Sequence, residues 1–150
     1  MHSCGFSLLE LLVALVVAAL LVAVATPAYF QYANTTYRRE GQADLLNCAQ
    51  AMERLAADSF SYANAADGDG DGVGDLDVGP IAASVCVPTS VERYRISVDG
   101  NATTYTLVAT PIGPMAGDGA IAFDAAGNRA WDRDGDGVFE TDAGENDWNL

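Results

Sequence analysis

Residues 5–27 read GFSLLELLVALVVAALLVAVATP, and the unbroken apolar run over residues 11–25 decides the fold. With the apolar residues just before it, the segment reaches about 20 residues. At ~1.5 Å rise per residue, this is the length of a helix that crosses a bilayer core. A buried helix of a soluble protein is rarely apolar on every side. The run therefore predicts a helix that lies in a membrane.

Three simpler interpretations compete: a cleaved secretory signal, a plain transmembrane anchor and a core helix. A signal cut near Thr26 is disfavoured because the first five residues carry no Lys or Arg, and because Glu10 interrupts the apolar region. A plain anchor is disfavoured because a carboxylate costs about 2.5–3.5 kcal/mol near a bilayer centre. A carboxylate kept there usually has a function and a cationic partner.

Charge is distributed very unevenly along the 150 residues. The chain has 21 acidic and 7 basic side chains, all of the latter Arg, for a net charge of −14. Such a balance argues against a general nucleic-acid binder, because phosphate contacts need a basic surface. The first 30 residues are almost uncharged, and most acidic residues lie beyond residue 65. We therefore expect an apolar amino-terminal element followed by one acidic domain.

The amino-terminal motif resembles that of type IV prepilins. Gly5-Phe6-Ser7-Leu8-Leu9-Glu10 is followed by the apolar run and then by Pro27. The resemblance implies that a prepilin peptidase cuts between Gly5 and Phe6 and methylates the new amino terminus. Glu10 then corresponds to the glutamate of the family, and Pro27 to a proline in the middle of the long helix. The implied partners are other pilin subunits, in a homo- or hetero-filament, the peptidase and the inner-membrane assembly machinery.

The chemistry of the new terminus is consistent with this resemblance. Cleavage creates an amine with a pKa near ~8, one helical turn from Glu10 or opposite the Glu10 of a neighbour. In an apolar helix bundle the two charges offset each other's desolvation, so Glu10 guides the register between subunits. The leader departs from the family in having only His2 in place of Lys or Arg. Charge counting would then place the wrong end in the cytoplasm, so either translation starts upstream or the peptidase motif suffices.

Beyond the membrane segment the pattern predicts that the helix continues to about Asp58, with a kink or local opening over residues 22–27 because Pro27 lacks a backbone donor. One apolar stripe is expected to face a sheet: Leu45, Cys48, Ala49, Met52, Leu55 and Ala56. The opposite side is expected to carry Arg38, Arg39, Glu40, Asp44 and Glu53.

Alternating residues predict strands at 94–98 and 105–110, then at 120–124 and 129–131, with turns at 99–101 and 127–128. The expected fold class is α+β, a type IV pilin fold with a long kinked helix packed on a three- to four-stranded antiparallel sheet. The domain organisation is then a leader at 1–5, a transmembrane and assembly half-helix at 6–27, and a periplasmic or extracellular head at 28–150.

The head also resembles PilE-type minor pilins. The features in common are Arg38-Arg39, Leu45-Leu46, the hexapeptide AQAMER at 49–54 and Tyr62-Ala63. After loss of Cys4 with the leader, Cys48 and Cys86 remain, and an even pair outside the cytoplasm predicts a disulfide. Chain-entropy models assign such a link about 4 kcal/mol. The alternative is two unpaired buried thiols.

Two acidic segments repeat the pattern Asp-x-Asp-x-Asp-Gly, and they resemble calcium loops of the EF-hand or dockerin kind. The implied ligands of the first are Asp67, Asp69, Asp71, Asp75, the Val73 carbonyl and Asp77. Those of the second are Asp132, Asp134, Asp136, Glu140, the Val138 carbonyl and Asp142. The bidentate Glu expected at position twelve is absent, so one or two weak structural Ca²⁺ sites are expected. The alternative is a solvated Asp-Gly loop.

No arrangement of nucleophile, base and orienting group is visible, so we expect a non-enzyme. The favoured function is a minor type IV pilin, single-pass in the inner membrane and then part of an extracellular filament. One alternative is a type II secretion pseudopilin, which shares the leader and helix. Another is a DNA-uptake minor pilin, in which Arg93, Arg95, Arg129 and Arg133 cluster on the sheet. The net charge disfavours nucleic acid as a partner.

Overall fold

The computed structural model describes residues 7–139 and 144–148. The predictions for His2, Cys4, Gly5 and Phe6, and for Glu140 and Asp142, therefore lie outside the described residues. The chain divides into two compact units, residues 1–36 and residues 37–150.

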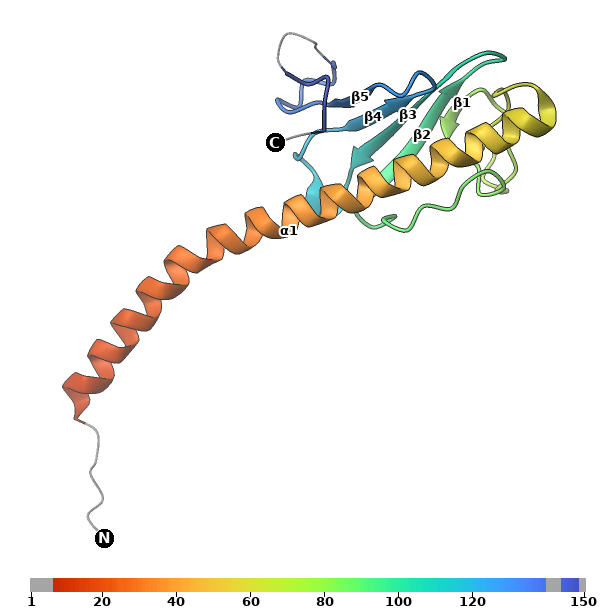
Figure 1. Ribbon diagram of the computed structural model, residues 1–150. Coiled ribbons are helices and arrows are strands. Elements are labelled where there is room, and N and C mark those ends of the chain that lie inside the picture. Colours follow the sequence, from red (N-terminus) through yellow and green to blue (C-terminus); the bar gives the residue numbers. More distant parts are fainter. Residues whose placement is uncertain (1–6, 140–143, 149–150) are drawn as a thin grey trace. The chain divides into compact units, whose positions relative to one another are not determined.

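One long helix, α1 (Leu8–Ser59), spans 52 residues and enters both units (Figure 1). It ends one residue after the predicted position. Pro27 lies inside α1, and the helix continues through it, so of the predicted kink or local opening the local opening does not occur. Close to the proline, the Thr26 hydroxyl donates a hydrogen bond to the Val22 carbonyl at 2.7 Å.

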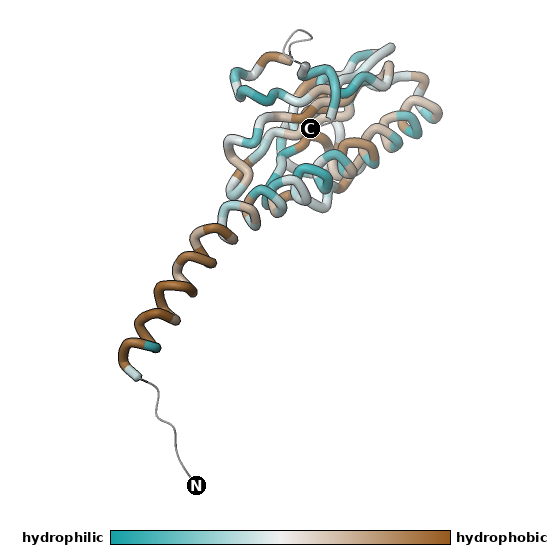
Figure 2. The backbone as a smooth tube through the Cα atoms, turned by 60° about the vertical axis from the view of Figure 1, so that its left-hand side comes forward, coloured by the Kyte–Doolittle hydropathy of each residue, from teal (hydrophilic) through white to brown (hydrophobic). Residues whose placement is uncertain are grey.

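The amino-terminal unit is an apolar helix with an uncovered surface. Every side chain from residue 7 to residue 32 is exposed, and Figure 2 shows this half of α1 as almost continuously hydrophobic. Among the described residues, α1 is long and apolar enough to cross a membrane. An apolar surface of this extent requires lipid or other protein chains to cover it.

The carboxy-terminal unit contains a five-stranded antiparallel meander in the order β1-β2-β3-β4-β5. The strands are β1 (Val78–Pro80), β2 (Tyr94–Gly100), β3 (Tyr105–Pro111), β4 (Ile121–Asp124) and β5 (Arg129–Trp131). The α+β pilin fold is thereby confirmed, with one strand more than expected. The additional strand, β1, is only three residues long, too short to show an alternating pattern.

The turn between β2 and β3 lies later than predicted. Residues 99 and 100 belong to β2, where Asp99 pairs with Thr106 and Gly100 with Tyr105. The turn is formed by residues 101–104. Its side-chain support comes from Asn101, whose Oδ1 accepts the backbone N–H of Thr103 at 2.8 Å. The sequence Asp-Gly at 99–100 resembles a hairpin turn, but pairing with β1 on one side and β3 on the other keeps it extended.

The core lies between α1 and the inner face of the sheet. Four stripe residues of α1 are buried as predicted, and Leu55 is half-buried against them. The buried stripe residues are Leu45, Cys48, Ala49 and Met52, and the strands contribute Tyr94, Ile96, Val98, Tyr105, Leu107, Ala109, Ile121 and Trp131.

Two charged residues placed on the solvent side of α1 are instead buried, which corrects the sequence-based expectation. Arg38 is 8% exposed because its guanidinium pairs with Asp118. Asp44 is 2% exposed because its carboxylate accepts four hydrogen bonds from Thr89 and Ser90. Partners that lie 80 and 45 residues away along the chain compensate both desolvation costs.

A disulfide joins Cys48 to Cys86, with Cα atoms 5.2 Å apart. The predicted pairing is therefore present. It holds the β1–β2 connection against α1, one helical turn after Asp44 binds the same connection at Thr89 and Ser90. Covalent and hydrogen-bonded links thus lie side by side on one face of the helix.

Candidate assembly helix and acidic loops

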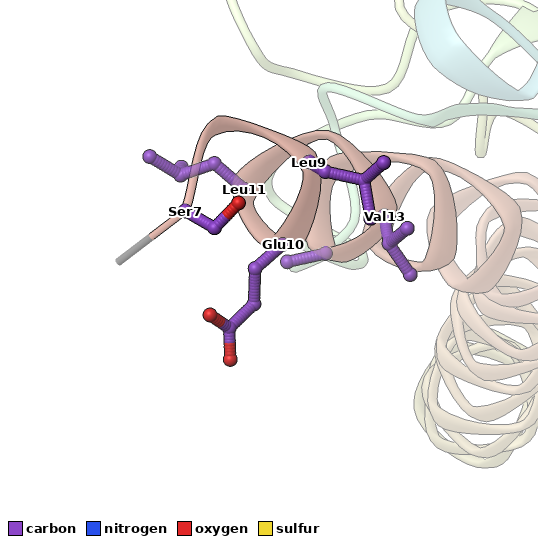
Figure 3. A pocket seen from close by; sticks show the side chains of 6 residues that line it. Ser7, Leu9, Glu10, Leu11 and Val13 are labelled. Atoms are coloured by element: carbon purple, nitrogen blue, oxygen red, sulfur yellow. The ribbon is translucent and has the colours of Figure 1, made fainter. Parts of the chain in front are cut away.

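Glu10 is the one charged residue between residue 6 and residue 37. Figure 3 shows its carboxylate extending away from the helix, with the apolar side chains of Leu9, Leu11 and Val13 around its base. No hydrogen-bond or ion-pair partner reaches it within the described part of the chain. A single carboxylate on an exposed apolar helix is suited to pair with a cation that another molecule supplies.

The first acidic loop brings three carboxylates together. Ligand oxygens of Asp67, Asp69 and Asp71 lie within 4.8 Å of one another. Asp67 accepts the N–H groups of Gly70 at 2.6 Å and Gly72 at 2.9 Å, so it closes the loop. Both glycines have positive φ angles, 85° and 87°, which residues with a Cβ rarely adopt.

The second acidic loop repeats this arrangement residue for residue. Asp132, Asp134 and Asp136 form the corresponding group within 4.8 Å. Asp132 accepts the N–H groups of Gly135 at 2.7 Å and Gly137 at 3.1 Å. Their φ angles of 77° and 85° match those of the first loop. Two separate segments have therefore folded into the same carboxylate-lined turn.

Not every predicted ligand joins these groups. Asp75 accepts the N–H of Gly68 at 2.8 Å, and Asp77 accepts the N–H of Asn64 at 2.9 Å, outside the triad. Val73 and Val138 donate their own N–H groups to Asp71 and Asp136, each at 2.7 Å. Carboxylates at three of the predicted positions thus converge in each loop, and the carbonyls of Val73 and Val138 stay predicted ligands.

Glu145 was not among the predicted site residues. It is 1% exposed, and its Oε1 accepts the N–H of Arg133 at 2.7 Å, beside the second loop. Its carbonyl also accepts the N–H of Trp131 at 2.8 Å, which covers the outer edge of β5. Glu145 lies fourteen positions into the acidic segment, where the loop motif has no ligand, so no spacing signal points to it.

The predicted cluster of four arginines on the sheet does not form. Arg95 alternates with the buried Tyr94 and Ile96, so it lies on the outer face. Arg129 pairs with Phe123, which in turn pairs with the buried Leu107, so it lies on the inner-face side. Arg93 forms an ion pair with Glu40 at 2.9 Å.

Around β5 the arginines instead stack on tryptophan rings. Arg38 lies 3.7 Å and Arg133 4.8 Å from the ring centroid of Trp131, and Arg129 lies 5.1 Å from that of Trp148. The Trp131 indole N–H donates to the Asp118 carbonyl at 2.8 Å. These contacts hold the carboxy-terminal strands to α1.

Tyr94 completes this buried group. Its hydroxyl donates to Asp118 Oδ2 at 3.2 Å. Burial, reinforced by the Asp118 carboxylate, raises the pKa of Tyr94 well above its ordinary value. The phenol therefore stays protonated as a donor at all physiological pH values.

Comparison with known families agrees with this architecture. Residues 1–26 match the model of the prokaryotic N-terminal methylation motif, as expected for a type IV pilin. Residues 27–121 match the model described as type IV minor pilin ComP, DNA uptake sequence receptor. That second match covers well over half of the chain, and the chain belongs to this family of type IV minor pilins. No curated protein and no solved structure matches the chain.

Membership confirms the minor-pilin interpretation of the amino-terminal motif. Members of this class are processed by prepilin peptidase and assemble with other pilins, and pilin families are structural rather than enzymatic. The apolar helix is consistent with a membrane-anchored pilin that later enters a pilus. The net charge disfavoured nucleic acid as a partner, and the family match gives no support to that prediction.

Proposed function

We propose that this minor pilin is cut between Gly5 and Phe6, methylated on Phe6, and held in register in the filament by Glu10. The observation that carries the proposal is the isolated carboxylate of Glu10 on an otherwise apolar, fully exposed helix. Cleavage supplies the missing cation, because the new amine has a pKa near ~8 and is charged at neutral pH.

The physical mechanism is a transfer from lipid to protein surroundings. In lipid the apolar side chains of α1 are covered by acyl chains, and in a filament they are covered by the helices of neighbours. The carboxylate and the ammonium offset each other's desolvation only in the correct register. Pro27 contributes to assembly in this proposal, because it leaves one helical carbonyl without its usual donor and makes that turn the easiest to deform.

Mass spectrometry of sheared filaments tests the processing step. The expected chain starts at Phe6, is one methyl group heavier and carries the Cys48–Cys86 link. A chain starting at Tyr29 would show an ordinary secretory signal and refute the proposal.

Substitution of Glu10 tests the register step. Glu10→Ala is expected to abolish incorporation into filaments, while Glu10→Asp retains part of it and Leu9→Ala serves as the matched control on the same turn. Normal incorporation of Glu10→Ala would refute the ion-pair mechanism and leave the family assignment intact.

We further propose that the acidic loops hold Ca²⁺ as a structural ion. Three carboxylates within 4.8 Å supply hard oxygen ligands, and their mutual repulsion favours a divalent cation. The corresponding hydrogen bonds that the three aspartates accept in each loop support one site in each. The absence of an acidic residue at position twelve, where Val78 and Ala143 stand, argues for weak sites suited to calcium outside the cell.

A second candidate function is reception of DNA during uptake. It is favoured by the match over residues 27–121 to a family described as a DNA uptake sequence receptor. The exposed arginines Arg39, Arg54 and Arg95 can contact phosphates. Two bound Ca²⁺ ions would offset four of the fourteen net negative charges and weaken the repulsion of a duplex.

A gel shift with the full chain in detergent decides this second function. Binding is expected at low salt with Ca²⁺ present, with affinity falling as salt rises, because phosphate contacts release counterions. Arg95→Ala is expected to weaken binding, whereas Glu92→Ala, which removes a nearby acidic group, is expected to strengthen it. Absence of a shift at low salt with Ca²⁺ would eliminate DNA reception by this chain alone.

A further inference from the structure

Phe60 has a backbone conformation that does not suit its residue type. It is the first residue after α1, with φ at +57°, and its N–H donates to the Ala56 carbonyl at 2.8 Å. This left-handed position after a helix is usually taken by Gly or Asn, because a Cβ makes it strained. Asn64, four residues later, has a similar φ of +59° and is a residue type that tolerates it.

The side chain of Phe60 has almost no packing against residues 7–139 and 144–148. Its exposed fraction is 91%, higher than the 82% of Leu8 on the membrane helix. The neighbouring backbone is well held: the Ser59 hydroxyl lies 2.7 Å from the Leu55 carbonyl and 2.8 Å from the Ser61 carbonyl. A large aromatic side chain is thus presented to solvent at a defined position, at the cost of backbone strain.

We propose that Phe60 docks into an apolar pocket on the head of a neighbouring pilin in the filament. The proposal rests on the filament assembly described above. Burial of the Phe60 ring at an interface offsets the backbone strain that is uncompensated in the isolated head. Aromatic residues commonly dominate the binding energy of such interfaces.

The net charge of this chain indicates which kind of neighbour supplies the pocket. A second copy of this chain carries the same net charge of −14, so contact between two such heads is opposed by repulsion. An anionic lipid surface is disfavoured for the same reason, because its headgroups repel an acidic head. The pocket therefore belongs to a different pilin with a less acidic head, and this minor pilin is inserted next to it in the filament.

Substitution of Phe60 tests this role, because it is expected to raise the stability of the head and to lower its recovery in filaments. Phe60→Gly, in the full chain in detergent, is expected to raise the Tm of the head by about 3–6 °C, because glycine relieves the backbone strain. The same variant in cells is expected to be recovered in sheared filaments at least fivefold less than the wild type. Phe60→Asn should behave similarly, and Val87→Ala, which shortens another exposed apolar residue, should change neither quantity.

Two results would overturn the proposal. A fall in Tm for Phe60→Gly would show that Phe60 stabilises its own head, and unchanged recovery in filaments would show that it makes no assembly contact. Phe60→p-benzoylphenylalanine identifies the partner: photo-crosslinking to another pilin supports the proposal. Crosslinking to a second copy, to lipid or to nothing refutes it. Because Glu10 and processing remain intact in these variants, failure here leaves the register mechanism untouched.

Discussion

Arg38 and Asp118 form a two-point ion pair, with guanidinium–carboxylate distances of 2.8 and 2.6 Å, across 80 residues of sequence. Both side chains are only 9% exposed. Arg38 stacks on Trp131 and Asp118 accepts from Tyr94, so the pair connects α1, β2 and β5. The precise placement of the two side chains determines their contribution to stability, because a misplaced partner would leave a buried ion uncompensated.

Removing one partner of this pair is expected to destabilise the head strongly. Arg38→Ala should lower the free energy of unfolding by about 3–5 kcal/mol, since Asp118 is left buried without its cation. Urea unfolding of the full chain in detergent, followed by Trp131 and Trp148 fluorescence, measures this. Arg39→Ala, an exposed neighbour, should change the free energy by about 0.5 kcal/mol at most. Similar losses for the two variants would contradict this role of Arg38.

The carboxylate of Asp44 is expected to be as important as the disulfide beside it. Asp44→Ala leaves the N–H and hydroxyl donors of Thr89 and Ser90 without an acceptor, and should cost about 3 kcal/mol or more. The loss should persist with the Cys48–Cys86 bond intact, in the same urea assay. Asp58→Ala, exposed on the same helix, is the control. A loss confined to reduced protein would show that the disulfide alone holds the connection.

Alkaline pH is expected to unfold the head. Burial raises the pKa of Tyr94 and of Tyr105 above the ordinary value near 10, so the folded state binds more protons than the unfolded state once pH exceeds ~10. Stability is therefore fully present below pH ~10 and falls above it, by up to ~1.4 kcal/mol per pH unit for each tyrosine.

Tyr94→Phe provides the check on this pH dependence. The variant should be less stable than wild type at pH 7, because Asp118 loses a donor, yet its stability should fall less steeply above pH 10. Tyr29→Phe, exposed on the amino-terminal helix, should leave the slope unchanged. An equal slope in Tyr94→Phe and wild type would exclude Tyr94 as a titrating group.

Calcium binding is expected to reverse the effect of neutralising a loop carboxylate. Asp71→Asn and Asp136→Asn keep an acceptor for the N–H groups of Val73 and Val138 while removing one charge. Without metal each variant should match or exceed wild-type stability, because repulsion in the loop decreases. With millimolar Ca²⁺ the wild type should become the more stable protein.

Thermal unfolding with and without Ca²⁺ measures this reversal, and isothermal titration counts the sites. Asp99→Asn, which removes an exposed acidic group outside the loops, should not alter the calcium response. A wild-type Tm that is unaffected by Ca²⁺ would indicate that the loops are solvated turns only.

Local pattern was sufficient for the helix and most of the sheet. An apolar run of bilayer length, the stripe through Leu45 and Met52, and alternation in β2 and β3 depend on neighbours one to four residues apart, so they can be read from the chain. The acidic motifs are local in the same sense, whereas the pairing of Cys48 with Cys86, 38 residues apart, was predicted from the even number of cysteines. The cleavage motif and the glutamate at position 10 carried the family resemblance, which the family models confirmed.

Tertiary structure alone decided which charges are buried and which arginines meet. The sequence pattern placed Arg38 and Asp44 on the solvent side of the helix, because their partners lie far along the chain. Glu145 belongs to no motif that would have predicted its role. The separation of Arg95 from Arg129 depends on strand register, since opposite faces of a sheet are set by pairing rather than by composition. Local periodicity thus specifies secondary structure, whereas long-range desolvation and pairing determine which side chains share a site.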